Sequence, residues 1–175
     1  RGLGDVYKRQ LGEELARRDL TLVYGGGDVG LMGIVADACL AAGGHVIGVI
    51  PQQLVDFEVS HQHITQLEVV DTMAQRKTRM EELADAFVCL PGGVGTLEEL
   101  TEVLTMQQLG NIHGPVGLVD VQGFWQPFVH MYSAMVQEGF VQQRFLDALV
   151  VEPTPVGVLD AFGSWTNPGS KWGNN

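Results

Sequence analysis

The chain has 175 residues, of which 45% are hydrophobic and 23 are glycine, a composition typical of one globular α/β domain. Its formal net charge of -11 at pH 7 argues against binding to a nucleic-acid backbone, although local N–H groups and arginines can still hold a small anion. No apolar stretch has the length of a membrane span and no signal peptide is visible, so the sequence predicts a cytoplasmic protein without a membrane partner.

The N-terminal segment, residues 1–10, is an atypical start for an α/β domain, because no apolar strand precedes the first helix. Residues 11–18 are expected to form the end of that amphipathic helix. We therefore expect that the natural N-terminus is truncated here or replaced by non-native sequence. The predicted organisation is one nucleotide-binding domain over residues 1–162 and a polar tail over residues 163–175 that frays.

Strands and helices alternate in the first half of the chain. In chain order the predicted elements are a strand at 21–24, a glycine turn at 25–30, a helix at 32–43, a strand at 45–50, a polar loop at 51–66, a short strand at 67–70 and a helix at 73–83. Asp71 or Thr72 is predicted to cap the last of these helices. Cys39 and Cys89 fall in apolar segments and are expected to be reduced core residues.

The second half repeats this alternation, which predicts a parallel sheet with right-handed crossovers. The predicted elements are a strand at 87–90, a glycine turn at 91–95, a helix from Thr96 to Gly110, a strand at 116–119, a helix at 124–138, a strand at 149–151 and a weak helix at 155–162. The residues expected to be buried on the two longer helices are Leu97, Leu100, Val103, Leu104, Phe128 and Met131.

Two glycine turns, Gly25-Gly26-Gly27-Asp28-Val29-Gly30 and Pro91-Gly92-Gly93-Val94-Gly95-Thr96, each connect a buried strand to a helix. This arrangement points backbone N–H groups at an anion, and glycine permits both close approach and a positive φ. In a parallel sheet both turns lie at the carboxyl edge, so they can face one ligand. Neither turn is a Walker A motif, and the first gives no clean dinucleotide fingerprint, which favours a mononucleotide.

Several charged side chains accompany the turns. Arg76 lies on an apolar helical stripe, where an inward guanidinium needs a carboxylate or phosphate partner; the alternative is a solvated position at the rim. Glu98 and Glu99 follow the second turn, although Thr96-x-x-Glu99 also matches a capping box. Glu58 by itself resembles a surface loop acid. The pair His61 and His63 lacks a third ligand at a suitable spacing, so no metal site is predicted.

Taken together, Gly25-Gly26-Gly27-x-x-Gly30-Leu31-Met32-Gly33, Arg76-Lys77 and Pro91-Gly92-Gly93-x-Gly95-Thr96-x-x-Glu99 resemble the LOG family, the cytokinin riboside 5′-monophosphate phosphoribohydrolases. The resemblance covers roughly residues 11–150. It implies a Rossmann-like, doubly wound parallel sheet with helices on both faces, at least a homodimer, and no metal or organic cofactor. It further implies hydrolysis of the N-glycosidic bond of an N6-modified AMP, which releases the free base and ribose 5-phosphate.

The resemblance also implies roles for individual residues. Arg76 and Glu99 would be the catalytic pair, with Glu98 close by. The other residues implied to contact the nucleotide or its phosphate are Gly92, Gly93, Val94, Gly95, Thr96, Lys77, Glu58, Thr105, Gly26 and Gly27. An oxocarbenium-like sugar needs a carboxylate near C1′, which fits this assignment.

The sequence departs from the family pattern at two places. Ala74 stands where the family usually has a histidine, and the first strand with its Gly-Ser turn is not recognisable before Leu11. The alternative function is a non-catalytic protein that binds a nucleotide or the molybdenum cofactor. The lysine decarboxylase label often given to this family has no support, because no lysine has the context of a pyridoxal-phosphate site.

Overall fold

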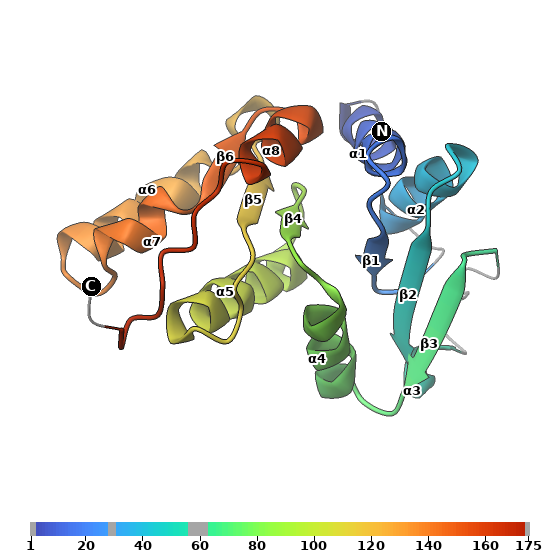
Figure 1. Cartoon of the computed structure of the whole chain (residues 1–175), viewed down its shortest axis with the longest axis horizontal. Coiled ribbons are helices and arrows are strands. Elements are labelled where there is room, and N and C mark those ends of the chain that lie inside the picture. The colour runs from blue at the N-terminus through green and yellow to red at the C-terminus, as the bar shows by residue number, and fades with distance from the viewer. Residues whose placement is uncertain (1–2, 28–30, 56–62, 174–175) are drawn as a thin grey trace. The chain divides into compact units, whose positions relative to one another are not determined.

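The computed structural model describes residues 3–27, 31–55 and 63–173. The chain divides into an N-terminal unit, Arg1–Ala84, and a C-terminal unit, Asp85–Asn175. Each unit contains a three-stranded parallel sheet with helices packed against it (Figure 1).

In the N-terminal unit the strand order is β1-β2-β3, with Leu22 opposite Val46 and Gly48 opposite Leu67. Helices α2 and α4 pack against β1 and β2. The elements are α1 (Leu3–Arg17), β1 (Leu22–Tyr24), α2 (Leu31–Ala41), β2 (Val46–Pro51), α3 (Gln52–Val55), β3 (Gln66–Val70) and α4 (Met73–Leu83). Two features differ from the prediction: α1 already begins at Leu3, and the short helix α3 interrupts the expected loop.

The core of this unit lies between α1, α2 and the sheet. Its fully buried members include Val35, Cys39 and Val46. The two helices approach closely at Gly12, where a Cβ would lie 2.8 Å from both the Ala38 Cβ and the Cys39 nitrogen. Cys39 is a free, buried cysteine, as predicted, and burial raises the pKa of its thiol.

In the C-terminal unit the strand order is β4-β5-β6, with Phe87 opposite Val116 and Gly117 opposite Val150. The elements are β4 (Phe87–Cys89), α5 (Val94–Leu109), β5 (Val116–Val119), the 3-10 helix η1 (Val121–Gly123), α6 (Gln126–Gln137), α7 (Gln143–Asp147), β6 (Val150–Glu152) and α8 (Pro155–Phe162). Helix α7 was not predicted from the sequence.

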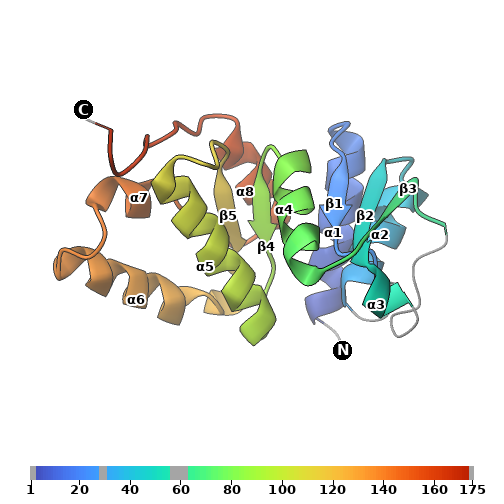
Figure 2. The ribbon, with the colours of Figure 1, turned by 90° about the horizontal axis from the view of Figure 1, so that it is seen from below.

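Helices cover both faces of this sheet (Figure 2). Successive side chains of a strand point to opposite faces, so β5 packs against helices on both sides. Gly117 faces α8, where a Cβ would lie 2.5 Å from Val158 Cγ1 and 2.8 Å from the Phe162 ring. Its neighbours Val116 and Leu118 belong to a core cluster with side chains of α5 and α6. The other buried members of that cluster are Leu100, Leu104, Trp125, Phe128, Tyr132 and Leu149.

Three expectations for this unit were wrong. Leu97 is 37% exposed and Met131 is 47% exposed, while Tyr132 occupies the buried position on α6. The C-terminal segment does not fray over the described residues. Instead, the Trp165 indole donates to the Ala148 carbonyl at 2.8 Å, and the Lys171 amide donates to the Gln108 carbonyl at 2.7 Å.

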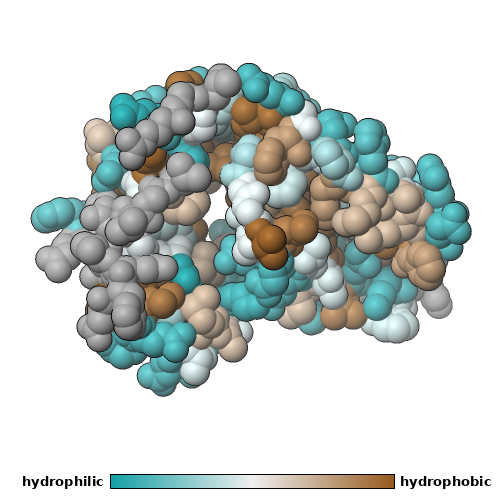
Figure 3. Space-filling view, turned by 180° about the vertical axis from the view of Figure 1, so that it is seen from behind, coloured by the Kyte–Doolittle hydropathy of each residue, from teal (hydrophilic) through white to brown (hydrophobic). Residues whose placement is uncertain are grey.

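Within the described part of the chain, no helix combines the length and hydropathy that crossing a bilayer requires. The face drawn in Figure 3 shows hydrophobic side chains as separate patches among hydrophilic ones, rather than as a continuous belt.

Candidate active site

The two glycine turns follow β1 and β4, so each lies beyond the carboxyl end of a parallel strand, as predicted. Ligands of α/β proteins bind at this edge of a sheet. The first turn is described as far as Gly27, and the second is described completely. Asp28, Glu58 and His61 lie outside the described residues.

Arg76 is fixed to the first turn through α4. This helix begins with the predicted cap at Thr72, whose side chain accepts from the Gln75 amide while Gln75 Oε1 accepts from the Thr72 amide, both at 3.2 Å. Four residues after the cap, the half-buried Arg76 directs its guanidinium to the residue that follows β1, where Nη2 donates to the Gly25 carbonyl at 2.6 Å. The prediction that Arg76 points inward is therefore correct.

The partner of this guanidinium differs from the expected carboxylate or phosphate. In the described part of the N-terminal unit, Arg76 contacts the carbonyl of Gly25 and, at 3.8 Å, the sulfur of Met73. A carbonyl oxygen accepts a hydrogen bond but carries no full negative charge. A guanidinium has several N–H donors in a fixed fork, so a second, anionic partner remains chemically compatible with this contact.

Gly26 is glycine for reasons internal to the fold. Its φ of +74° lies in the left-handed region, and a Cβ would lie 3.3 Å from both Ile50 and Leu67. Beneath it, a Cβ on Gly48 would lie 2.8 Å from the Gly26 Cα. The bend at Gly26 therefore rests directly on β2, and Gly27 follows it as a half-buried residue.

Within the second turn the non-helical backbone ends at Gly93, the N-cap of the 16-residue helix α5, and Val94, Gly95 and Thr96 already belong to that helix. Gly93 has extended backbone (φ -94°, ψ -158°), and no side chain caps the helix. Because α5 already begins at Val94, Thr96 is its third residue, and the predicted start at Thr96 was wrong. The capping-box interpretation of Thr96 and Glu99 is wrong for the same reason. The first amides of α5 therefore have no side-chain cap, which leaves a site suited to an anion.

The glycines of this second turn differ in what surrounds them. A Cβ on Gly92 would overlap the Thr96 side chain, which folds back over it. A Cβ on Gly93 or on Gly95 would meet no atom within 4 Å, and neither has a positive φ. Neither the backbone nor the packing of this unit requires glycine at these two positions. They line open space, where a ligand can approach the backbone.

The two predicted carboxylates are exposed on the second turn of α5. Glu99 lies close enough to the end of β4 to act on Cys89: burial first, and then the Glu99 charge, raise the pKa of that thiol to about 12. Cys89 is free and packs, half-buried, against the core cluster of this unit, in agreement with the prediction of a reduced core residue. The Glu99 charge therefore acts on the end of β4, where the second glycine turn begins.

The two remaining predicted contact residues lie on different helices. Lys77 is half-buried on α4, in the same unit as Arg76. Thr105 is exposed on α5, and its hydroxyl donates to the Thr101 carbonyl at 2.7 Å. Sequence reasoning missed Gly25, which accepts from Arg76. A signal was present, because three consecutive glycines are more than the single positive φ at Gly26 requires.

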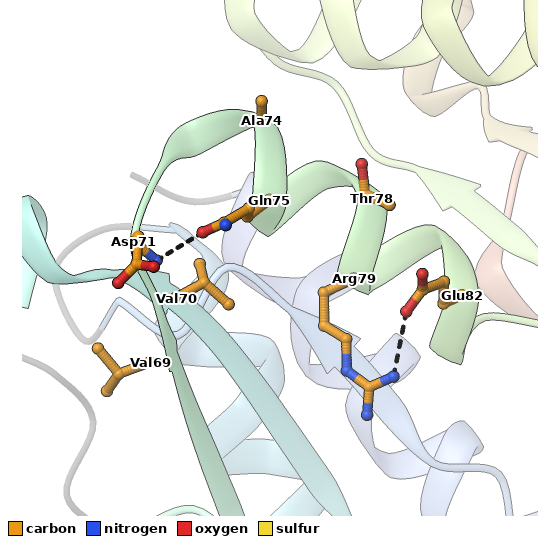
Figure 4. A pocket seen from close by; sticks show the side chains of 8 residues that line it. All are labelled: Val69, Val70, Asp71, Ala74, Gln75, Thr78, Arg79 and Glu82. Atoms are coloured by element: carbon orange, nitrogen blue, oxygen red, sulfur yellow. Dashed lines mark hydrogen bonds and ion pairs between the residues drawn. The ribbon is translucent and has the colours of Figure 1, made fainter.

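A separate open pocket of about 530 Å³ lies in the N-terminal unit between the end of β3 and α4 (Figure 4). Its wall includes Ala74, where the resemblance leads one to expect histidine, and Arg79, which is paired with Glu68 at 2.6 Å and with Glu82 at 3.3 Å. These ion pairs raise the pKa of Arg79, and the Arg79 hydrogen bond lowers the pKa of Glu68. None of the predicted catalytic or phosphate-binding residues lines this pocket.

Comparison with known proteins supports the family assignment. A family model described as "Possible lysine decarboxylase" matches residues 32–162. The chain is 47% identical over 145 residues to the cytokinin riboside 5′-monophosphate phosphoribohydrolase LOG of Oryza sativa, covering 83% of this chain and 60% of that protein. It is 43% identical over 145 residues to LOG1 of Arabidopsis thaliana, covering 83% of this chain and 68% of that protein. The chain belongs to the LOG family.

Solved structures confirm the fold class of this LOG-family chain. A molybdenum cofactor binding protein from Rippkaea orientalis matches with a TM-score of 0.71 and 19% identity, covering 94% of this chain and 88% of that one. The molybdenum cofactor carrier protein of Chlamydomonas reinhardtii matches with a TM-score of 0.69 and 19% identity, covering 92% and 86%. At this identity the likeness establishes the Rossmann-like α/β fold and nothing about ligands. The chain spans 60% of the length of the rice LOG protein.

Proposed function

We propose that this LOG-family chain is a nucleoside 5′-monophosphate phosphoribohydrolase that cleaves the N-glycosidic bond of an N6-modified AMP. The observation that carries the proposal is the open backbone of Gly93 and Gly95 at the uncapped start of α5, with a carboxylate one turn further along. Its curated relatives are named as enzymes of this activity.

In this proposal the 5′-phosphate binds at the start of α5. Backbone amides from Gly92 to Thr96 would donate to its oxygens, and the positive end of the helix dipole favours the anion. An absent Cβ at Gly93 and Gly95 lets the phosphate approach the chain closely. The further ligand contacts that we propose are Gly26, Gly27, Glu58, Lys77 and Thr105.

The reaction adds water across the bond between C1′ and the purine nitrogen. The water oxygen bonds to C1′, one of its protons stays on the new hydroxyl, and the other goes to the departing base. The sugar passes through an oxocarbenium-like state, which a carboxylate stabilises electrostatically and for which it can orient the water. We propose Arg76 and Glu99 as the catalytic pair. Glu99, with Glu98 beside it, has this role, and Arg76 contacts an anionic group of the nucleotide.

Cellular location and oligomeric state are two further points of the proposal. We propose that the chain acts in the cytoplasm as a homodimer or larger homo-oligomer. Light scattering on the purified protein measures the oligomeric state, and a monomer mass under turnover conditions would contradict this part. The molybdenum-cofactor alternative has no specific observation in its favour, because the two molybdenum-cofactor proteins that match this chain share only its fold at 19% identity.

The decisive experiment incubates the purified chain with a panel of nucleoside 5′-monophosphates, including plain AMP and N6-substituted AMP. Chromatography measures free base, and a coupled assay measures ribose 5-phosphate. We expect both products in equal amounts and none from the corresponding nucleosides, which lack the phosphate. Binding of AMP without release of base would instead support the non-catalytic alternative.

A further inference from the structure

We propose that Gly25 is a positioning residue for the reaction, because its main-chain carbonyl orients the Arg76 guanidinium and its missing side chain gives the guanidinium its place. The role in catalysis rests on the proposed function, whereas the contact itself is part of the N-terminal unit.

Both ends of the contact are held by the fold. On one side, Gly25 directly follows β1, which is paired with β2. On the other side, α4 is fixed at its start by the Thr72 capping box, and the Arg76 amide donates to the Thr72 carbonyl at 3.0 Å. The hydrogen bond of 2.6 Å between Arg76 Nη2 and the Gly25 carbonyl joins positions that are 51 residues apart in the chain. Bonds that use a charged donor are among the stronger hydrogen bonds in proteins.

Gly25 has no backbone reason to be glycine, since its φ is not among the positive values of this chain. What a side chain would meet is the guanidinium. A Cβ on Gly25 would overlap Arg76 Nη2 and would lie 2.7 Å from Cζ and 3.1 Å from Nε. These three Arg76 atoms are the nearest neighbours that such a Cβ would have. Gly25 is therefore glycine because a Cβ would overlap the Arg76 side chain, whereas Gly26 is glycine because the backbone there is left-handed.

This arrangement gives the guanidinium a fixed place without neutralising it. A carboxylate at the same position would orient Arg76 equally well but would compensate its charge. A carbonyl orients it and leaves the charge for an anionic ligand at the carboxyl edge of β1. Small displacements of a substrate-positioning group are costly, on the order of 10²-fold in rate for a shift of about 1 Å.

The test uses four proteins: the wild type, Gly25→Ala, Arg76→Ala and the double variant. We expect Gly25→Ala to reduce kcat for base release by on the order of 10²-fold. We expect the double variant to be no slower than Arg76→Ala, because Gly25 acts only through that side chain. The matched control is Gly4→Ala on α1, where a Cβ would lie 3.6 Å from the Lys8 Nζ; it should keep wild-type turnover.

Chemical rescue separates positioning from a general structural effect. Millimolar guanidinium should restore part of the turnover of Arg76→Ala, because the place beside Gly25 is then vacant. It should fail with the double variant, in which the methyl group added at position 25 occupies that place. Equal rescue of both variants, or a Gly25→Ala protein with unchanged kcat, would overturn the proposal.

Thermal unfolding of the same four proteins tests the contact independently of the activity. Gly25→Ala should lower Tm when Arg76 is present and should have a smaller effect when position 76 is alanine. If Gly25→Ala does not fold, the double variant should fold, since the overlap is gone. An equal loss of Tm in both backgrounds, or a double variant that also fails to fold, would show that the glycine serves another purpose. Absence of base release from the wild type would instead reject the proposed function. The Tm values of the four proteins would still show whether Gly25 and Arg76 interact.

Discussion

The two glycine turns look alike in sequence but are built for different purposes. In the first turn, the space beside Gly25 is taken by the Arg76 guanidinium, and Gly26 is needed for a left-handed bend. In the second turn, Gly93 and Gly95 have extended or helical backbone and open space above them. The space beside Gly25 is filled by a cationic side chain of its own unit, whereas the space beside Gly93 and Gly95 is open. A glycine-rich turn is therefore evidence for a ligand only where neither backbone conformation nor packing already requires the glycine.

The largest expected effect concerns the carboxylate beside the open turn. Glu99→Gln should reduce base release by on the order of 10² to 10³-fold, because the oxocarbenium-like state loses its counter-charge. Tm should remain close to that of the wild type, since Glu99 is exposed and does not cap α5. The control is Glu138→Gln, an exposed acid at the end of α6 in the same unit. Unchanged turnover in Glu99→Gln would remove the catalytic role.

A smaller effect, with opposite signs for stability and binding, is expected at Gly95. Gly95→Ala should stabilise the protein by up to about 1 kcal/mol, because alanine is the better helix former and meets no neighbour. It should also raise KM for AMP by roughly 10-fold, because a Cβ hinders the charged hydrogen bonds to phosphate. Denaturant titration and steady-state kinetics measure the two quantities.

Gly92→Ala provides the contrast within the same turn. Its Cβ would overlap Thr96, so it should cost about 1–3 kcal/mol of stability. If Gly95→Ala instead lost stability and left KM unchanged, the second turn would be closed like the first, and the comparison between the turns would be wrong.

The smallest effect concerns the Cys89 thiol, which reports where Glu99 points. Burial and the Glu99 charge raise the pKa of Cys89 to about 12 from an ordinary 9.0. Its contribution to stability is therefore complete below pH 9 and is lost as the pH rises towards 12. At pH 9, iodoacetamide should leave Cys89 of the native protein unmodified, as judged by mass spectrometry.

Glu99→Gln should lower the pKa of Cys89 slightly, because burial is the larger cause and remains. Alkylation of Cys89 at high pH should then increase modestly. Cys39, whose pKa is raised by burial alone, is the internal control and should not change. Identical alkylation of Cys89 in both proteins would mean that the Glu99 carboxylate lies away from β4.

Much of the fold follows from local patterns. Short apolar runs predicted the six strands of the described residues to within a few positions. The residue types at Asp71 and Thr72 predicted a helix cap at one of the two, and the structure shows it at Thr72. The start of α5 was predicted too late in the chain. Its N-cap is Gly93, which has no side chain that could indicate a cap, whereas threonine, as at Thr96, is a preferred N-cap residue. On α6, helical periodicity allows both Met131 and Tyr132 beside Phe128, and only the packing decides between them.

The candidate site was predicted in its residue types but not in its internal contacts. Arg76 was expected to point inward on account of the stripe that it interrupts, which is a local pattern. Its partner Gly25 is 51 residues away in the chain, so no local pattern could reveal the contact. The open space at Gly93 and Gly95 is likewise a property of everything that packs, or does not pack, around the turn.

Val94 stands between those two glycines with 85% of its surface exposed. Its main chain belongs to the helix start while its side chain is exposed, so the phosphate contacts that we propose there would use the polypeptide backbone and not this side chain. In the proposed site, a fluorophore attached to a cysteine introduced at this position would lie beside the bound anion without replacing a proposed contact. The proposed function therefore implies that position 94 is an attachment point for an optical sensor of nucleotide binding.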